Sequence, residues 1–186
     1  KKYYPIKKIR KKFFLIIGRH NPHKNLRRVI KAFAYSKIND YKLIFVGPFD
    51  KRHTPILLKL IDKHNIRHLC VWKGWIDDDE KLSLLNECHA LIIASLWEGF
   101  GLPALEAMAC GTPVIASDRG ALREVMGNYG YFINPFNIQS IACAMNAVIN
   151  DKKCFEKALQ EGPSRAESFN WLDTARTIEK IIQEID

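Results

Sequence analysis

The alternation of short apolar runs with longer amphipathic stretches constrains the fold of this chain most strongly. Six runs, rich in β-branched and aromatic residues, have the length of buried strands. They are Phe13–Ile17, Leu43–Val46, Leu69–Trp72, Leu91–Ala94, Pro113–Ala116 and Tyr131–Ile133. The stretches between and after them have helical periodicity: Asn25–Ser36, Thr54–Asn65, Asp78–Glu87, Pro103–Cys110, Ala121–Met126, Asn137–Asn150, Lys152–Ser168 and Trp171–Ile185. This order predicts an α/β fold, a Rossmann-like parallel sheet with helices on both faces.

The length of 186 residues and a hydrophobic fraction of 47% fit one domain, which we place at residues 13–186. Seven of residues 1–12 are Lys or Arg, and we interpret this segment as a basic linker arriving from an N-terminal domain. A first residue other than Met agrees with that interpretation. Such a basic run either lies solvated on the surface or contacts an anionic membrane.

Composition narrows the class of partner and the compartment. A net charge of +9 favours phosphorylated or polyanionic partners, but no aromatic residues are interleaved with the basic ones in a nucleic-acid pattern. The five cysteines form no Cys-x-x-Cys pair, which predicts reduced thiols and no zinc site. No apolar run reaches the roughly 18 residues of a membrane helix. We therefore expect a cytoplasmic protein, with the cytoplasmic face of the membrane as the alternative.

Glycine-bearing or charged loops follow five of the predicted strands. In an open α/β sheet such loops converge at the carboxyl edge, where these folds bind ligands. The sequence therefore predicts one ligand site formed by the segments Gly18–Lys24, Gly47–Asp50, Gly74–Asp77, Leu96–Gly101 and Ser117–Gly120.

Two carboxylates flank a glycine-rich loop that opens a predicted helix. Pro103 suits the first helical position, so the loop before it would present free amide groups at the positive end of a helix dipole. Such a loop binds a phosphate or a sugar oxygen. Glu106, placed on the first turn, could accept hydrogen bonds from a ribose diol, and Glu98 could reach sugar hydroxyls. The alternative is a helix cap with two surface carboxylates.

Arg19 and Lys24 lie five positions apart in the loop after the first strand. A guanidinium and an ammonium suit a pyrophosphate, and their charge would stabilise that group as it leaves. The alternative is two solvated bases at the start of a helix.

Three motifs occur in order along the chain. Gly-Arg-x4-Lys-Asn-Leu starts at Gly18, Gly-Trp-Ile-Asp-Asp at Gly74, and Glu-Gly-Phe-Gly-Leu-Pro-x-Leu-Glu-Ala-Met-Ala-Cys-Gly-Thr-Pro-Val at Glu98. Together they resemble the C-terminal, donor-binding domain of the retaining GT-B glycosyltransferases of the large group-one family. The likeness covers roughly residues 13–150, and the closing helix from Phe169 is similar too.

The resemblance implies one half of a GT-B fold and a role for each matching residue. Arg19 and Lys24 would hold the donor diphosphate, and Glu106 the ribose. The sugar and the distal phosphate would be held by Glu98 and the amides of Phe100, Gly101 and Leu102. The nucleotide cleft would be lined by Gly47 and Pro48, and the backbone of Trp75 and Ile76 would meet the nucleobase.

The resemblance further implies transfer with retention of configuration, without a metal or cofactor. The Gly-Phe-Gly-Leu-Pro and Lys-Asn-Leu motifs resemble those of mannosyl- and rhamnosyl-type polysaccharide enzymes, and this resemblance favours GDP-mannose as donor. A glycan or lipid-linked acceptor would be bound by an N-terminal domain outside this chain, against which Trp171–Ile185 would pack. Two departures, Arg123 in place of proline and Asn134 in place of aspartate, affect only details of the sugar pocket.

Weaker signals have plainer interpretations. Asp77–Asp79 could bind Mg²⁺, but N-capping of the next helix explains the run. For His20 and His23 we expect solvated loop positions. The rival functions are a GT-B relative such as a sugar epimerase, a stand-alone nucleotide-sugar-binding module, and nucleic-acid binding through the basic surface.

Overall fold

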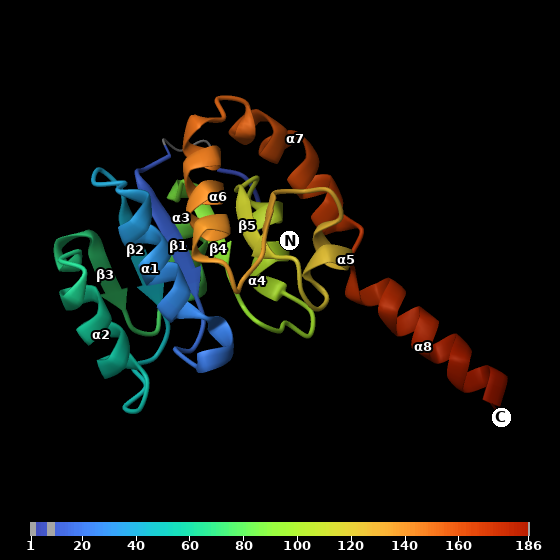
Figure 1. The fold of residues 1–186 in the computed structure, drawn as a ribbon. Coiled ribbons are helices and arrows are strands. Elements are labelled where there is room, and N and C mark those ends of the chain that lie inside the picture. Colours follow the sequence, from blue (N-terminus) through green and yellow to red (C-terminus); the bar gives the residue numbers. More distant parts are fainter. Residues whose placement is uncertain (1–2, 7–9, 186) are drawn as a thin grey trace.

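The computed structural model describes residues 3–6 and 10–185 (Figure 1). Within them a parallel six-stranded sheet has the order β3-β2-β1-β4-β5-β6. The strand bounds are β1 Phe13–Ile17, β2 Lys42–Val46, β3 Cys70–Lys73, β4 Ala90–Ile93, β5 Val114–Ser117 and β6 Tyr131–Ile133. The order reverses between β1 and β4, which lie side by side at the centre. The predicted Rossmann-like parallel sheet is confirmed.

Helices connect the strands and cover both faces of the sheet (Figure 1). In the described part of the chain they are α1 Leu26–Ser36, α2 Thr54–Lys63, α3 Asp78–Glu87, α4 Leu102–Ala109, α5 Leu122–Met126, α6 Ile138–Asn150, α7 Cys154–Glu167 and α8 Trp171–Ile185, with short 3-10 turns at Pro22–Lys24 and Arg67–Leu69. The predicted helices and strands all form, with ends shifted by up to two residues.

Two apolar cores lie on opposite faces of the sheet, because successive side chains of a strand point to opposite sides. Phe14 and Ile16 pack with α1, α2 and α6 on one face. Phe13 and Leu15 pack with α3, α4 and α5 on the other. A strand buried on both faces has to be apolar throughout, which explains the uninterrupted run Phe13–Ile17.

Part of the predicted basic linker packs on the domain. The Ile6 amide donates to Asn86 Oδ1 at 2.6 Å. The Arg10 guanidinium donates to Leu85 O and Gly111 O, both at 2.8 Å, and to Thr112 Oγ1 at 2.9 Å. Arg10 therefore joins the ends of α3 and α4. Residues 1–2 and 7–9 of the same segment lie outside the described residues.

The closing helix α8 extends away from the sheet (Figure 1). Its large apolar side chains are exposed: Trp171, Leu172, Ile178, Ile181 and Ile182. Packing of this helix on an N-terminal domain stays a prediction. Among the residues described here, we find no helix with both the length and the apolarity to span a bilayer.

Candidate functional site

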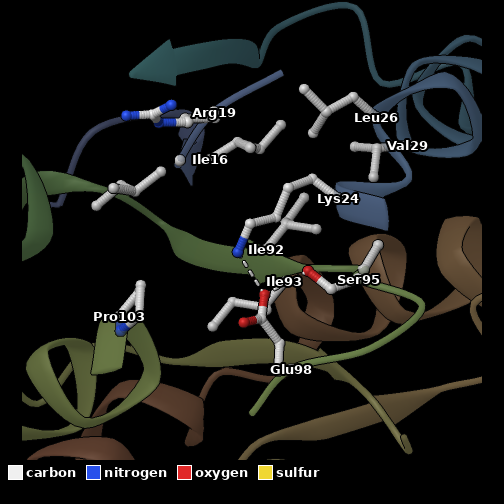
Figure 2. A pocket seen from close by; sticks show the side chains of 13 residues that line it. Ile16, Arg19, Lys24, Leu26, Val29, Ile92, Ile93, Ser95, Glu98 and Pro103 are labelled. Carbon is white, nitrogen blue, oxygen red and sulfur yellow. Dashed lines mark hydrogen bonds and ion pairs between the residues drawn. The ribbon is translucent and has the colours of Figure 1, made fainter. Parts of the chain in front are cut away.

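A small pocket lies at the carboxyl edge of the sheet, between the loops that follow β1 and β4 (Figure 2). Its volume is about 10 Å³. Its polar lining comes from Arg19 and Lys24 of the first loop and from Ser95 and Glu98 of the second, with Pro103 of α4 on one side. The strand order reverses here, which is where ligands bind in open α/β sheets. The three residues predicted to be catalytic, Arg19, Lys24 and Glu98, are thus brought together.

Lys24 and Glu98 form an ion pair across this pocket (Figure 2). The Lys24 Nζ to Glu98 Oε1 distance is 2.5 Å, and the side chains are only 20% and 13% exposed. Ser95 donates its hydroxyl to the same carboxylate oxygen at 2.6 Å. The backbone also joins the two loops, since the Leu96 amide donates to His23 O at 2.7 Å. The Lys24–Glu98 ion pair is therefore held in place by the Ser95 hydroxyl and by the backbone hydrogen bond between the two loops.

Arg19 is exposed at the rim of this pocket and has no ion pair with any described residue. Figure 2 shows its guanidinium pointing away from the Lys24–Glu98 pair. A free guanidinium at the mouth of a pocket attracts anions, and its planar fork matches phosphate oxygens.

The loop before α4 supplies further donors. Gly101 caps the helix with a φ of +95°, and a Cβ at this position would lie 2.7 Å from a Leu122 methyl carbon. The amides of Phe100, Gly101 and Leu102 donate no hydrogen bond to another described residue. The Phe100 ring packs edge-on against Phe169 at 5.9 Å, which turns this side chain toward the closing helices. Free amides at a helix N-terminus form an anion-binding surface.

Two details of α4 differ from the sequence prediction. Because Gly101 accepts the left-handed conformation, the helix begins at Leu102, and Pro103 is its second residue rather than its first. Glu106 consequently lies on the second turn, not the first. Its carboxylate pairs with Lys81 of α3 at 2.5 Å.

Glu106 does not line the same pocket as the Lys24–Glu98 pair. It borders a wider groove of about 710 Å³ together with Tyr3 and Tyr4 of the N-terminal segment and Phe169 and Trp171 near α8. The contact between Glu106 and a ribose stays a prediction. It requires a ligand long enough to reach from the pocket of the Lys24–Glu98 pair to this groove.

Gly47 follows β2 and lies against the loop after β1. A Cβ on Gly47 would lie 2.1 Å from Gly18 O, so only glycine fits at this edge. Gly47 lines a cavity of about 220 Å³ with Trp72 and Gly74, and Pro48 follows it in the same loop. Its predicted place in a ligand cleft is consistent with this cavity, while the nucleotide contact itself stays a prediction.

His20 also lines that cavity, and here the sequence prediction of a solvated loop histidine was wrong. Its side chain is 4% exposed, and Nδ1 lies 2.8 Å from Thr54 Oγ1. The ring meets the Trp72 ring edge-on at 4.9 Å. Burial lowers the His20 pKa, since charging the imidazole there would cost solvation free energy. Its Nε2 is buried and has no hydrogen-bond partner within the described residues.

Trp75 and Ile76 follow β3 on the next loop. Trp75 is 78% exposed, whereas Ile76 packs against the core beneath the sheet. An exposed indole thus lies next to a partly buried neighbour on this loop. The predicted contact with a nucleobase remains a prediction.

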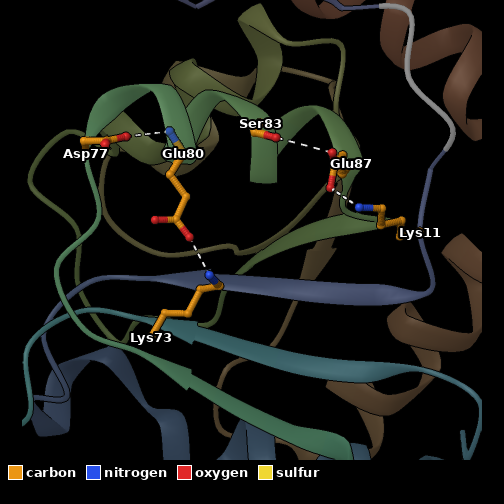
Figure 3. Close-up of polar contacts among 6 residues, drawn as sticks. All are labelled: Lys11, Lys73, Asp77, Glu80, Ser83 and Glu87. Carbon is orange, nitrogen blue, oxygen red and sulfur yellow. Dashed lines mark hydrogen bonds and ion pairs between the residues drawn. The ribbon is translucent and has the colours of Figure 1, made fainter.

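The acidic run after Trp75 caps a helix (Figure 3). Asp77 accepts the Glu80 amide at 2.7 Å, as predicted for an N-cap. Glu80 pairs with Lys73, and Glu87 with Lys11 at 2.6 Å. The residues in the described ranges hold no cluster of three or more His, Cys, Asp or Glu side chains placed to bind a metal.

Sequence reasoning missed Ser95, Lys81 and Thr54 as partners of the site. Ser95 stands three residues before Glu98, a short-range spacing that could have indicated the contact. Lys81 and Thr54 lie 25 and 34 positions from Glu106 and His20, so only the folded structure brings them together.

The family model described as Glycosyl transferases group 1 matches residues 5–165. An O-antigen chain mannosyltransferase B from Escherichia coli is 29% identical over 89% of this chain and 44% of its own length. The chain spans between about a fifth and a half of the length of such curated relatives.

Solved structures share the fold. The C-terminal domain of a glycosyl transferase group 1 family protein (LpcC) from Francisella tularensis aligns with a TM-score of 0.77 and 28% identity, over 89% of this chain and 94% of that one. Anabaena Alr3699/HepE, solved in complex with UDP and glucose, aligns with a TM-score of 0.84 and 22% identity, over 94% and 48%. The chain has the Rossmann-like fold that makes up about half of GT-B glycosyltransferases, and it belongs to the group 1 glycosyltransferase family.

Proposed function

We propose that this chain binds a nucleotide diphosphate sugar, with GDP-mannose favoured, as the donor domain of a retaining hexosyltransferase. The observation that carries the proposal is that Arg19 and Lys24 line one pocket at the carboxyl edge, with Pro103 of α4 beside them and unpaired amides in the loop that leads into α4. That set of donors is suited to a diphosphate.

Each residue then has a role in the transfer step. Arg19 and Lys24 neutralise the diphosphate as its bond to the sugar breaks, which lowers the barrier by electrostatic stabilisation. Glu98 orients the sugar through its hydroxyls, and Glu106 holds the ribose. Because the bond breaks and forms on one face of the sugar, the leaving phosphate assists the incoming hydroxyl and configuration is retained. No cofactor or metal enters this scheme.

The names of two relatives support a polysaccharide or glycolipid as the class of product. The Escherichia coli relative is an O-antigen chain mannosyltransferase, and another from Dictyostelium discoideum is an alpha-1,3/1,6-mannosyltransferase. We propose that the whole protein acts in polysaccharide or glycolipid synthesis in the cytoplasm or at its membrane face. A glycan or lipid-linked acceptor would be bound by an N-terminal domain, without which this chain alone would not transfer sugar.

Calorimetric titration of the protein with GDP, UDP, ADP and CDP tests the donor site. One nucleotide should bind saturably, and Arg19→Ala should weaken it by roughly 1.5–3 kcal/mol, or about ten- to a hundredfold. Arg52→Ala is the matched control, because Arg52 is exposed and lies outside the pocket. Equal weak binding of all four nucleotides that fades with salt would contradict the proposal. A full-length protein that interconverts sugar epimers instead of transferring them would favour the epimerase alternative.

A further inference from the structure

A second, larger groove runs between α1 and α2, on the face of the sheet opposite α4. We call it the α1–α2 groove; its volume is about 750 Å³. Its charged lining consists of Arg27 and Lys31 from α1 and Lys59 and Lys63 from α2. These residues stand four apart on each helix, so each pair lies along one side of its helix. No acidic residue lines the groove.

The four cations are not neutralised by the protein itself. None of them forms an ion pair with a residue in the part of the chain that the structure describes. The nearest carboxylate along α2 is Asp62, and it is engaged bidentately by Arg67 at 2.6 and 2.9 Å. Four uncompensated positive charges around one groove therefore attract an external anion.

Apolar side chains lie among these cations. Tyr35 on α1 is 58% exposed and Ile56 on α2 is 44% exposed, while Ala34, Leu60 and Ile138 line the groove between the helices. The helices α1 and α2 lie side by side (Figure 1). Exposed apolar groups framed by lysines and arginines match the boundary between lipid headgroups and acyl chains.

We propose that the α1–α2 groove is a docking surface for an anionic lipid membrane. The cations would contact headgroup phosphates, while Tyr35 and Ile56 would enter the headgroup layer. A nucleic acid would satisfy the charges but would leave Ile56 and the apolar floor of the groove without a partner. The charge and the apolarity together favour the membrane. The proposal is independent of the donor site, which lies at the edge of the sheet and stays open beside such a surface.

Co-sedimentation with lipid vesicles tests whether the α1–α2 groove docks on an anionic membrane. The protein should bind phosphatidylcholine vesicles that contain phosphatidylglycerol and should bind pure phosphatidylcholine far less. The double variant Lys59→Gln/Lys63→Gln should bind the anionic vesicles on the order of 10- to 30-fold more weakly. Lys152→Gln/Lys153→Gln, which removes the same charge from the exposed turn between α6 and α7, should change binding little. An equal loss in both variants, or equal binding to both vesicle types, would overturn the proposal.

A second variant separates membrane from nucleic acid. Tyr35→Ser/Ile56→Ser keeps every charge, so it should weaken binding to anionic vesicles, above all at raised salt, and leave adsorption of a single-stranded oligonucleotide unchanged. If the protein binds the oligonucleotide more tightly than the vesicles, and the serine variant loses nothing on vesicles, the partner is a nucleic acid and the proposal fails. An unchanged urea-denaturation midpoint would show that each variant is folded.

Discussion

The Lys24 ammonium contacts the Glu98 carboxylate at 2.5 Å, although the two residues follow different strands of the sheet. In this arrangement the cation proposed to hold the donor phosphate is already neutralised by the carboxylate proposed to hold the sugar. A diphosphate that enters the pocket has to draw Lys24 away from Glu98. Donor binding and release of the Glu98 carboxylate are then coupled.

Glu98→Gln should therefore affect the diphosphate and the nucleotide sugar in opposite directions. Without the competing carboxylate, Lys24 is free, and affinity for the nucleoside diphosphate should rise by about 0.5–1 kcal/mol, a few-fold. Affinity for the nucleotide sugar should fall instead, because a neutral amide holds sugar hydroxyls less strongly than a carboxylate. Paired calorimetric titrations measure both values. Equal loss of affinity for the two ligands would contradict the coupling.

The Lys81–Glu106 ion pair gives a separate prediction about the ribose. If Glu106 accepts hydrogen bonds from the ribose diol, Glu106→Gln should reduce the preference for a nucleoside diphosphate over its 2′-deoxy form by roughly tenfold. Competition titrations with the two nucleotides measure this ratio. Glu161→Gln, an exposed carboxylate on α7, serves as the control. An unchanged ratio in the Glu106 variant would place the ribose elsewhere.

Arg10 should be a major determinant of stability. Its guanidinium donates to Gly111 O after α4 and to Leu85 O of α3, which also accepts the Thr112 hydroxyl at 2.5 Å. Arg10→Ala would remove the hydrogen bonds to Gly111 O, Leu85 O and Thr112 Oγ1 together, and should lower the free energy of unfolding by about 3 kcal/mol. Urea denaturation measures the loss. Arg67→Ala, which breaks an exposed ion pair on the same chain, should leave the midpoint nearly unchanged; similar losses in both variants would refute the role of Arg10.

Stability should fall as the pH drops below about 6.5, because two buried histidines resist protonation in the folded protein. Burial lowers the pKa of both His20 and His89 in the folded protein, so below about pH 6.5 the unfolded chain binds more protons than the folded one. The free energy of unfolding is then fully retained above that pH and decreases between about pH 6.5 and 5. Denaturation curves across this window measure the slope.

His89→Gln should flatten that slope, because it removes one of the two groups that resist protonation. His89 lies in the core beside Tyr41 and Phe155, with Nε2 3.3 Å from Val148 O. His68→Gln replaces an exposed histidine and should leave the slope as it was. A His89 variant that is less stable but keeps the full slope would show that its protonation has no part in the effect.

The strands and helices could be predicted closely because their signals are local. Phe13–Ile17 and Tyr131–Ile133 were placed to the residue by apolar runs bounded by polar or glycine-bearing loops. The start of α4 was misplaced by one residue, because it depends on the left-handed conformation of Gly101. The backbone conformation of one glycine does not follow from residue spacing.

The site could be predicted only in part, and the features that were not predicted share a physical cause. Arg19, Lys24 and Glu98 follow adjacent central strands, so the topology alone brings them together. The burial of His20 and Arg10 depends on groups contributed by distant segments. Such contacts between segments far apart in the chain leave no trace in a local pattern of charge or hydrophobicity.

The adjacency of β1 and β4 also bears on how donor preference can change by mutation. Each loop at this edge is anchored to its own strand, so an insertion after the edge strand β3 can reshape the surface around Trp75 while the spacing of Lys24 and Glu98 is kept. Members of such a family can therefore diverge in the base or sugar that they accept, one loop at a time, around an unchanged charged centre.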